Sequence, residues 1–162
     1  MSNFTLRPTT AEDVPQILAF IRALADYERE PDQVVLTEDE LLRDGFGEKP
    51  LYRCLFAEID GKPVAFALFF FIYSTWRGPS IHLEDLFVYP EARGKGIGKA
   101  LLTKVASIAV SEGCRRLQWD VLEWNTTAIG FYESLGAVRM MDWRVMRVLG
   151  ENLPKLAAMS KL

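Results

Sequence analysis

Apolar and polar residues follow one another along this chain in two periods, and each period predicts one kind of secondary structure. Residues 4–7 have the alternation expected of a first strand. After Thr10 and Asp13, either of which can cap a helix, apolar residues recur at helical spacing until the charged stretch before Pro31. The chain is therefore predicted to begin with a strand and an amphipathic helix.

A strong hairpin signal lies in the next part of the chain. Before it, Thr37 and Glu40 have the spacing of a capping box and predict a short helix that stops at Gly45. Residues 52–59 and 64–73 are strand-like and flank an Asp-Gly dipeptide, which favours the tight turns that join antiparallel strands. Two adjacent antiparallel strands are therefore expected here.

The most informative stretch is residues 81–110, which reads as a buried strand, a glycine-rich turn and a long amphipathic helix. Gly94, Gly96 and Gly98 remove side chains where the helix begins and leave free backbone N–H groups at the positive end of the helix dipole. The turn also contains three basic residues, namely Arg93, Lys95 and Lys99. These features predict a site for a phosphate or a diphosphate.

Two common phosphate-binding motifs do not match this turn. A P-loop needs Gly-Lys followed by Ser or Thr, whereas Gly98 and Lys99 are followed by Ala100. A dinucleotide fingerprint needs its last glycine five residues after the first, whereas Gly98 comes four after Gly94. A glycine-rich turn that only caps an ordinary helix stays open as the alternative.

The rest of the chain predicts three short elements: a strand at 117–121, a helix at 125–135 and a final strand at 138–148. The length of 162 residues, with 49% hydrophobic residues, suffices for one full core. Because no linker or repeat interrupts it, residues 1–162 are predicted to form a single α+β domain with a largely antiparallel sheet.

Composition and charge restrict the expected partners. The net charge of −3 argues against a nucleic-acid partner. The longest apolar run, residues 64–73, is too short to span a bilayer, and the N-terminus has no secretory pattern, so no membrane partner is expected. Cys54 and Cys114 have no CxxC spacing, which predicts a reducing, cytoplasmic location. No motif of clustered Cys and His indicates a metal.

Candidate chemistry begins with Glu84 and Asp85, in the strand that leads to the glycine-rich turn. Consecutive strand residues face opposite sides, so at most one of them is expected to face a cleft shared with the turn. A carboxylate on an apolar strand is costly unless it is solvated, paired or functional, and a salt bridge stays open as the alternative. His82, the only histidine, is expected to be a strand residue with a satisfied ring, with a substrate contact as the alternative.

A second constellation occupies residues 123–137. Asn125 can cap a helix, and Tyr132 follows two turns later on nearly the same face. Taken alone, Phe131 and Tyr132 would be interpreted as core aromatics.

Together these blocks resemble the cofactor motifs of the GCN5-related N-acetyltransferase (GNAT) superfamily. The two matching segments read RGKGIGKALL, from residue 93, and WN-x-x-A-x-x-FY-x-x-LGA, from residue 124. LRPTTAEDVPQIL, ALADYE, FFFIYSTWRG and HLEDLFV further resemble its diamine acetyltransferase branch, which includes spermidine/spermine and thialysine-type enzymes. The likeness covers residues 4–147 and implies a mixed sheet of about six to seven strands with about four helices.

By this resemblance the chain is a transferase that moves an acetyl group from acetyl-CoA to a primary amine of a small polyamine, diamine or lysine-like molecule, without a metal and as a homodimer. Glu84 would be the general base and Tyr132 the general acid. The residues that would hold the cofactor are Leu86, Phe87, Val88, Arg93, Gly94, Lys95, Gly96, Ile97, Gly98, Lys99, Asn125, Thr126, Thr127 and Ala128. The residues that would meet the amine are Tyr27, Glu28 and Asp120.

Two departures from the family pattern affect the substrate. Asp120 stands where the family usually has an apolar residue, and Met140-Met141-Asp142 replaces an acidic stretch. The alternatives are a protein or aminoglycoside-type acceptor and, from a different class, a CoA-binding sensor without turnover.

Overall fold

A computed structural model describes residues 3–160 of the chain. The chain forms two compact units, of which the first ends at Leu122 and the second begins at Glu123. We call them the N-terminal unit and the C-terminal unit and describe each by itself. The prediction of a single domain stays a prediction.

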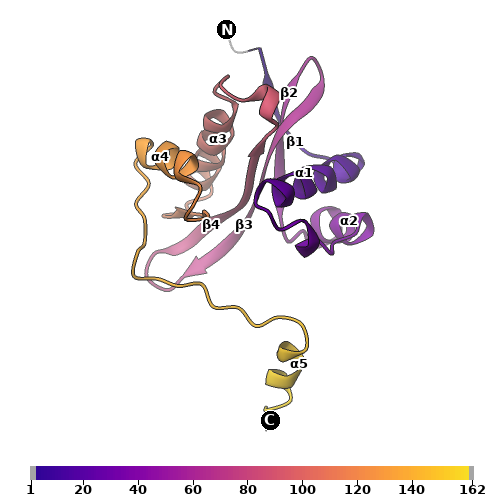
Figure 1. The fold of residues 1–162 in the computed structure, drawn as a ribbon, viewed down its shortest axis with the longest axis vertical. Coiled ribbons are helices and arrows are strands. Elements are labelled where there is room, and N and C mark those ends of the chain that lie inside the picture. The colour runs from indigo at the N-terminus through magenta and orange to yellow at the C-terminus, as the bar shows by residue number, and fades with distance from the viewer. Residues whose placement is uncertain (1–2, 161–162) are drawn as a thin grey trace. The chain divides into compact units, whose positions relative to one another are not determined.

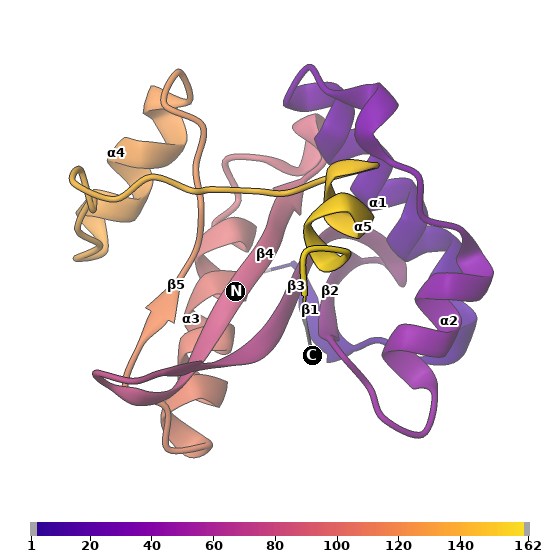
Figure 2. The same cartoon turned by 90° about the horizontal axis from the view of Figure 1, so that it is seen from below.

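The N-terminal unit is built on a five-stranded sheet in the order β1-β2-β3-β4-β5 (Figures 1 and 2). Neighbouring strands are antiparallel except for β4 and β5, which are parallel. The α+β class and the mostly antiparallel mixed sheet are therefore confirmed, with five strands against the six to seven expected. The strands are β1 (Thr5–Pro8), β2 (Arg53–Ile59), β3 (Lys62–Ser74), β4 (Gly78–Val88) and β5 (Leu117–Gln118).

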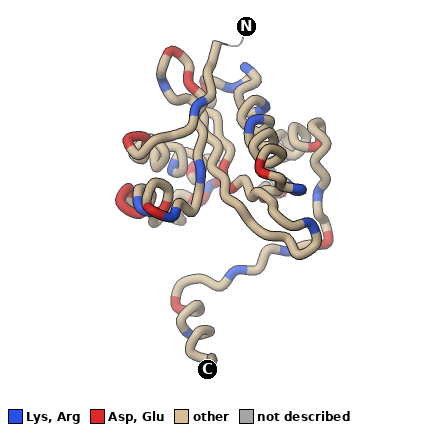
Figure 3. The backbone as a smooth tube through the Cα atoms, turned by 180° about the vertical axis from the view of Figure 1, so that it is seen from behind, with Lys and Arg blue, Asp and Glu red and all other residues tan. Residues whose placement is uncertain are grey.

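Helices cover both faces of this sheet. Figures 1 and 2 show α1 (Val14–Tyr27) and α2 (Glu38–Phe46) on one face and α3 (Ile97–Ser111) on the other. Lys and Arg mark α3 and the turn before it, where no acidic residue stands between positions 92 and 111 (Figure 3). Across the described chain, none of the helices has the length and apolarity needed to cross a bilayer.

The core between the sheet and α1 is rich in phenylalanine. Phe20 of α1 stacks on Phe66 of β3, with ring centroids 5.0 Å apart, and meets Phe56 of β2 edge-on at 5.4 Å. All three side chains are fully buried. Each aromatic ring buries a large apolar surface and holds its neighbours in a defined geometry. This packing fixes α1 on the sheet, and with it the position of the end of α1.

The predicted hairpin is confirmed in detail. Asp60 and Gly61 join β2 to β3 with φ values of 50° and 72°. Positive φ at both central residues is the backbone of the two-residue turn that suits the twist of antiparallel strands. The Asp-Gly dipeptide therefore sets the register between β2 and β3.

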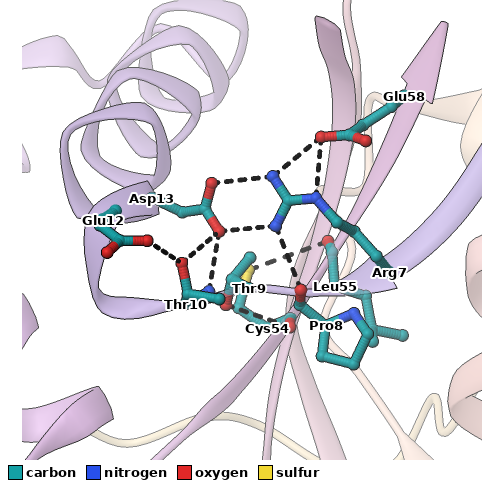
Figure 4. Close-up of polar contacts among 9 residues, drawn as sticks. All are labelled: Arg7, Pro8, Thr9, Thr10, Glu12, Asp13, Cys54, Leu55 and Glu58. Atoms are coloured by element: carbon teal, nitrogen blue, oxygen red, sulfur yellow. Dashed lines mark hydrogen bonds and ion pairs between the residues drawn. The ribbon is translucent and has the colours of Figure 1, made fainter. Parts of the chain in front are cut away.

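A network around Arg7 ties β1, β2 and the start of α1 together (Figure 4). The Arg7 guanidinium donates to both oxygens of Asp13, at 2.6 and 2.9 Å, and from Nε to Glu58 Oε1 at 2.8 Å. Asp13 also accepts from the Thr10 N–H at 2.7 Å, which completes the expected cap. Hydrogen bonds from Arg7 hold the pKa of the Asp13 carboxyl below its usual value.

The C-terminal unit contains α4 (Thr126–Ser134) and α5 (Asn152–Ala157) and no strand among its described residues. The strand expected at 138–148 is therefore wrong. A strand needs a neighbouring strand to satisfy its backbone, and no other segment of this unit offers one. Many apolar side chains of this stretch are exposed instead: Val138, Met140, Met141, Trp143, Val145, Met146, Val148 and Leu149.

Candidate active site

A β-bulge in β4 places the two candidate carboxylates on one face of the sheet. Asp85 lies opposite Leu68 of β3 and Leu83 lies opposite Phe69, so Glu84 is an extra residue with no partner in this register. Leu68 packs in the core beneath α1, whereas Leu83 faces the other side with Phe69. Glu84 follows Leu83 and therefore faces the opposite side, whereas Asp85 faces the same side as its partner Leu68. Both carboxylates thus lie on the α1 side of the sheet. The expectation that at most one could face the cleft is wrong because the bulge shifts the alternation.

Glu28 joins these two carboxylates from the end of α1, where it is the C-cap residue. Burial, together with the charges of Glu84 and Glu28, raises the pKa of Asp85 to about 7. Burial and the charge of Glu84 also raise the pKa of Glu28. We call Glu28, Glu84 and Asp85 the acidic cluster. Three carboxyl groups that repel one another form a site that favours a cationic ligand.

Asp85 was given no role from the sequence, although its neighbour Glu84 was. The only sequence signal is the pair of adjacent acids in an otherwise apolar strand. A regular strand would separate these two side chains, and no residue pattern announced the bulge that brings them together.

His82 contacts Glu84, the exposed member of the acidic cluster and the candidate general base. Its Nε2 lies 3.3 Å from Glu84 Oε2, and its Nδ1 lies 3.4 Å from the side-chain nitrogen of Gln118 on β5. The ring also stacks on Phe70 of β3, with centroids 5.2 Å apart. The expected satisfied ring is confirmed, and one of its partners is Glu84.

Arg93 connects the glycine-rich turn with the aromatic end of α1. Its Nε donates to the Val88 carbonyl at 2.9 Å. Its guanidinium lies 5.1 Å from the ring centroid of Tyr27 and 5.7 Å from that of Phe87. Both distances are within the range of cation–π contacts. Tyr27 and Arg93 are 66 positions apart in the sequence, and they thus belong to one local region of the N-terminal unit.

The turn itself has the backbone of an anion site. Gly94 and Gly96 have φ values of 76° and 78°, which side chains other than that of glycine rarely allow. Gly96 is the N-cap of α3, and the Ala100 N–H makes the first helical bond, to the Gly96 carbonyl. The N–H groups of residues 97–99 therefore point out of the helix end without a helical acceptor. Nothing lies within 4 Å of where a side chain at Gly94 or Gly96 would begin, so a diphosphate can approach the backbone.

The strand before the turn has an open edge. β5 pairs with β4 only at Ile81 and His82, so within residues 3–122 no strand covers this edge from Glu84 to Val88. The Tyr89 N–H donates to the Val64 carbonyl toward β3, so by alternation the backbone groups of Val88 and Leu86 point away from β3. This edge can therefore form backbone hydrogen bonds with an extended ligand.

Asp120 lies just beyond the end of β5. The expected strand of 117–121 ends at Gln118, and Asp120 is exposed. Within residues 3–122 it forms no ion pair.

The remaining predicted residues belong to the C-terminal unit. The Asn125 side chain accepts from the Ala128 N–H at 3.3 Å and caps α4, as expected. Thr126 and Thr127 form the exposed first turn of this helix. Tyr132 stands in its last turn, half-buried, with its ring centroid 5.3 Å from that of Phe131. The cap and the aromatic pair thus occupy opposite ends of one short helix.

No group of three or more His, Cys, Asp or Glu side chains in residues 3–160 is arranged to hold a metal ion. The groups that are present suit two other kinds of ligand. Backbone N–H groups with basic residues suit a diphosphate, and the acidic cluster suits an amine.

Comparisons with known proteins agree on one family. Residues 15–137 match the family model described as "Acetyltransferase (GNAT) family". A thialysine N-epsilon-acetyltransferase of Bos taurus is 43% identical over 97% of this chain and 99% of its own length. A spermidine/spermine N(1)-acetyltransferase-like protein 1 of Homo sapiens is 37% identical over 97% of this chain and 24% of its own length. Among solved structures, an integron cassette protein of V. cholerae is 28% identical, with a TM-score of 0.79 over 97% of this chain and 98% of that one.

Proposed function

This chain belongs to the acetyltransferase (GNAT) family and is an acyltransferase, and we propose that it moves an acetyl group from acetyl-CoA to a primary amine of a small diamine, polyamine or lysine-like molecule. The observation that supports this acceptor best is the acidic cluster of Glu28, Glu84 and Asp85 in the same unit as the glycine-rich turn. A neutral acceptor would give three adjacent carboxyl groups nothing to pair with.

In this proposal the glycine-rich turn and the open edge of β4 hold acetyl-CoA, which supplies the acetyl group as a thioester. The N–H groups at the start of α3, together with Lys95 and Lys99, bind the diphosphate. The backbone groups of Leu86 and the N–H of Val88 bind the extended arm and orient its carbonyl, whereas the backbone groups of Phe87 point to β3. Residues 125–128 provide further contacts from the C-terminal unit.

Glu84 acts as the general base and Tyr132 as the general acid. A free alkylamine has a pKa of about 10.4, so roughly one molecule in a few thousand is uncharged at neutral pH. This shortage corresponds to about 4 to 5 kcal/mol, which a positioned base can help to offset. The exposed Glu84 carboxylate removes the proton from the ammonium group, directly or through a water molecule, and the Tyr132 hydroxyl gives its proton to the leaving sulfur.

The remaining carboxylates determine which acceptor binds. Glu28 and Asp85 bind a second cationic group of the acceptor, Tyr27 offers a ring face to it, and Asp120 adds a negative charge beyond β5.

The chain is also proposed to act as a cytoplasmic homodimer. The exposed apolar side chains of residues 138–149 form a stretch that a second copy of the chain can cover. Light scattering of the 18.4 kDa chain should give about twice that mass. A monomer mass at micromolar concentration would contradict this part of the proposal.

The catalytic pair is tested by two conservative variants. Glu84→Gln and Tyr132→Phe should each lower kcat about a hundredfold while the melting temperature and the rise caused by acetyl-CoA stay unchanged. Glu84→Gln should recover partly as pH rises, because more of the amine is then uncharged. Wild-type rates in both variants would show that these residues have structural roles only, and binding of acetyl-CoA with no transfer to any amine, protein or aminoglycoside would favour a sensor.

A further inference from the structure

We propose that His82 is a positioning residue for Glu84: its ring, which is fixed in the sheet, holds the Glu84 carboxylate in one orientation. This inference rests on the proposed role of Glu84 as the general base. No part of the catalytic scheme above uses His82.

The ring of His82 is held on three sides. Phe70 of β3 stacks on it at 5.2 Å, Gln118 of β5 contacts Nδ1 at 3.4 Å, and Glu84 contacts Nε2 at 3.3 Å. The His82 side chain is 14% exposed, whereas that of Glu84 is 53% exposed. A nearly buried ring that cannot rotate freely thus contacts a carboxylate that otherwise extends into solvent. Such an arrangement limits the number of positions that the carboxylate can adopt.

The position of His82 in the sheet explains why this contact is stable. His82 and Gln118 form the last register pair of β4 and β5 before the two strands part. Glu84 follows two residues later, on the same face as His82, at the bulge. The histidine therefore anchors the base at the point where the open edge of β4 begins.

The partners of the ring determine where its proton lies. The Gln118 side-chain nitrogen can only donate, so Nδ1 accepts from it and carries no proton in the neutral ring. The ring proton then lies on Nε2, the nitrogen that is 3.3 Å from Glu84 Oε2. In this tautomer the ring presents its N–H, and not a lone pair, to the side on which the carboxylate lies.

The contact matters because Glu84 also has acidic neighbours. Glu28 from α1 and Asp85 from β4 interact with Glu84 as like charges. β3 and β5 contribute Phe70 and Gln118 beside the ring, and neither of these titrates. His82 therefore holds Glu84 at a place from which its acidic neighbours repel it.

The tautomer can be measured directly because the chain has a single histidine. Tag-free protein labelled with ¹⁵N-histidine should show the Nε2–H tautomer in long-range ¹H–¹⁵N spectra. A dominant Nδ1–H tautomer would overturn the proposal without any reference to activity.

Two variants test the consequence for the reaction. The Gln side chain places an amide N–H near the position of Nε2, whereas Asn reaches only the position of Nδ1. His82→Gln should keep kcat within about threefold, whereas His82→Asn should lower it about tenfold, with KM for acetyl-CoA unchanged in both variants. Equal losses of kcat in both variants would mean that His82 only packs against Phe70.

The role of His82 and the proposed function can be contradicted separately. If the wild type transfers no acetyl group to any amine, the proposed function is contradicted and the catalytic role of His82 with it. Normal transfer together with the wrong tautomer contradicts the role of His82 alone.

Discussion

Asp85 is the residue whose environment departs most from that of an ordinary surface carboxylate. It lies beneath α1, where burial and two neighbouring acids raise its pKa to about 7. Near neutral pH the acidic cluster therefore changes its charge with small changes in pH. Binding of a cationic group would favour the ionised form of Asp85, and an uncharged ligand would not.

The raised pKa of Asp85 predicts that ionisation of this residue lowers the free energy of unfolding. Because the folded-state pKa is raised from 3.8 to about 7, the folded protein keeps a proton that the unfolded chain has released. The contribution of the protonated Asp85 to the free energy of unfolding is fully present below about pH 4, and it is lost as the pH rises through 7. Asp85→Asn should therefore stabilise the protein, and by about 2 kcal/mol more near pH 8 than near pH 5, as measured by urea unfolding.

Asp120→Asn is the matched control, since Asp120 is exposed and the substitution is the same. Its effect on unfolding should not depend on pH. A gain of equal size at both pH values in Asp85→Asn would contradict the burial of a titrating carboxyl.

At the scale of elements, the strand, turn and helix of residues 78–111 supply most of the proposed site. β4 provides the bulged carboxylates and an open edge, and α3 begins with backbone N–H groups beside that edge. Each feature depends on backbone geometry more than on any single side chain. Substitutions that alter the backbone of the turn should therefore affect the cofactor first.

Gly96→Asp should abolish the rise in melting temperature that acetyl-CoA causes. A side chain at Gly96 would enter the space in front of the helix end, and its charge would repel a diphosphate. Gly113→Asp is the control, because Gly113 also has positive φ, 73°, and stands after the other end of α3. A full response to acetyl-CoA in Gly96→Asp, or an equal loss in both variants, would argue against this turn as the diphosphate site.

The sequence was sufficient for elements that depend on local signals. The Asp-Gly hairpin, the cap at Asn125 and the glycine turn follow from side chains within a few residues of one another. The bulge at Glu84 could not be predicted, because it depends on the register between β3 and β4. The strand expected at 138–148 failed for a related reason: its apolar residues are suited to a sheet, but strand formation needs a partner that the C-terminal unit does not contain.

At the scale of the whole molecule, charge is distributed unevenly. The start of α3 carries basic residues only, whereas the acidic cluster lies between α1 and β4 (Figure 3). In the proposed function, a protein with a net charge of −3 thus uses separate sites for an anionic cofactor and a cationic acceptor. Such complementarity selects partners by charge and speeds their encounter, and it weakens as salt screens the charges.

The central claim, that the acceptor is a molecule with two cationic groups, is tested most directly by comparing cadaverine with hexylamine. These amines have equal length and differ only in a terminal ammonium group in place of a methyl group. The second charge should raise kcat/KM at least about tenfold, the size expected of one charge-assisted contact. Asp120→Ala should raise KM for cadaverine and leave hexylamine almost unaffected. Equal kcat/KM values for the two amines in the wild type would contradict a dicationic acceptor.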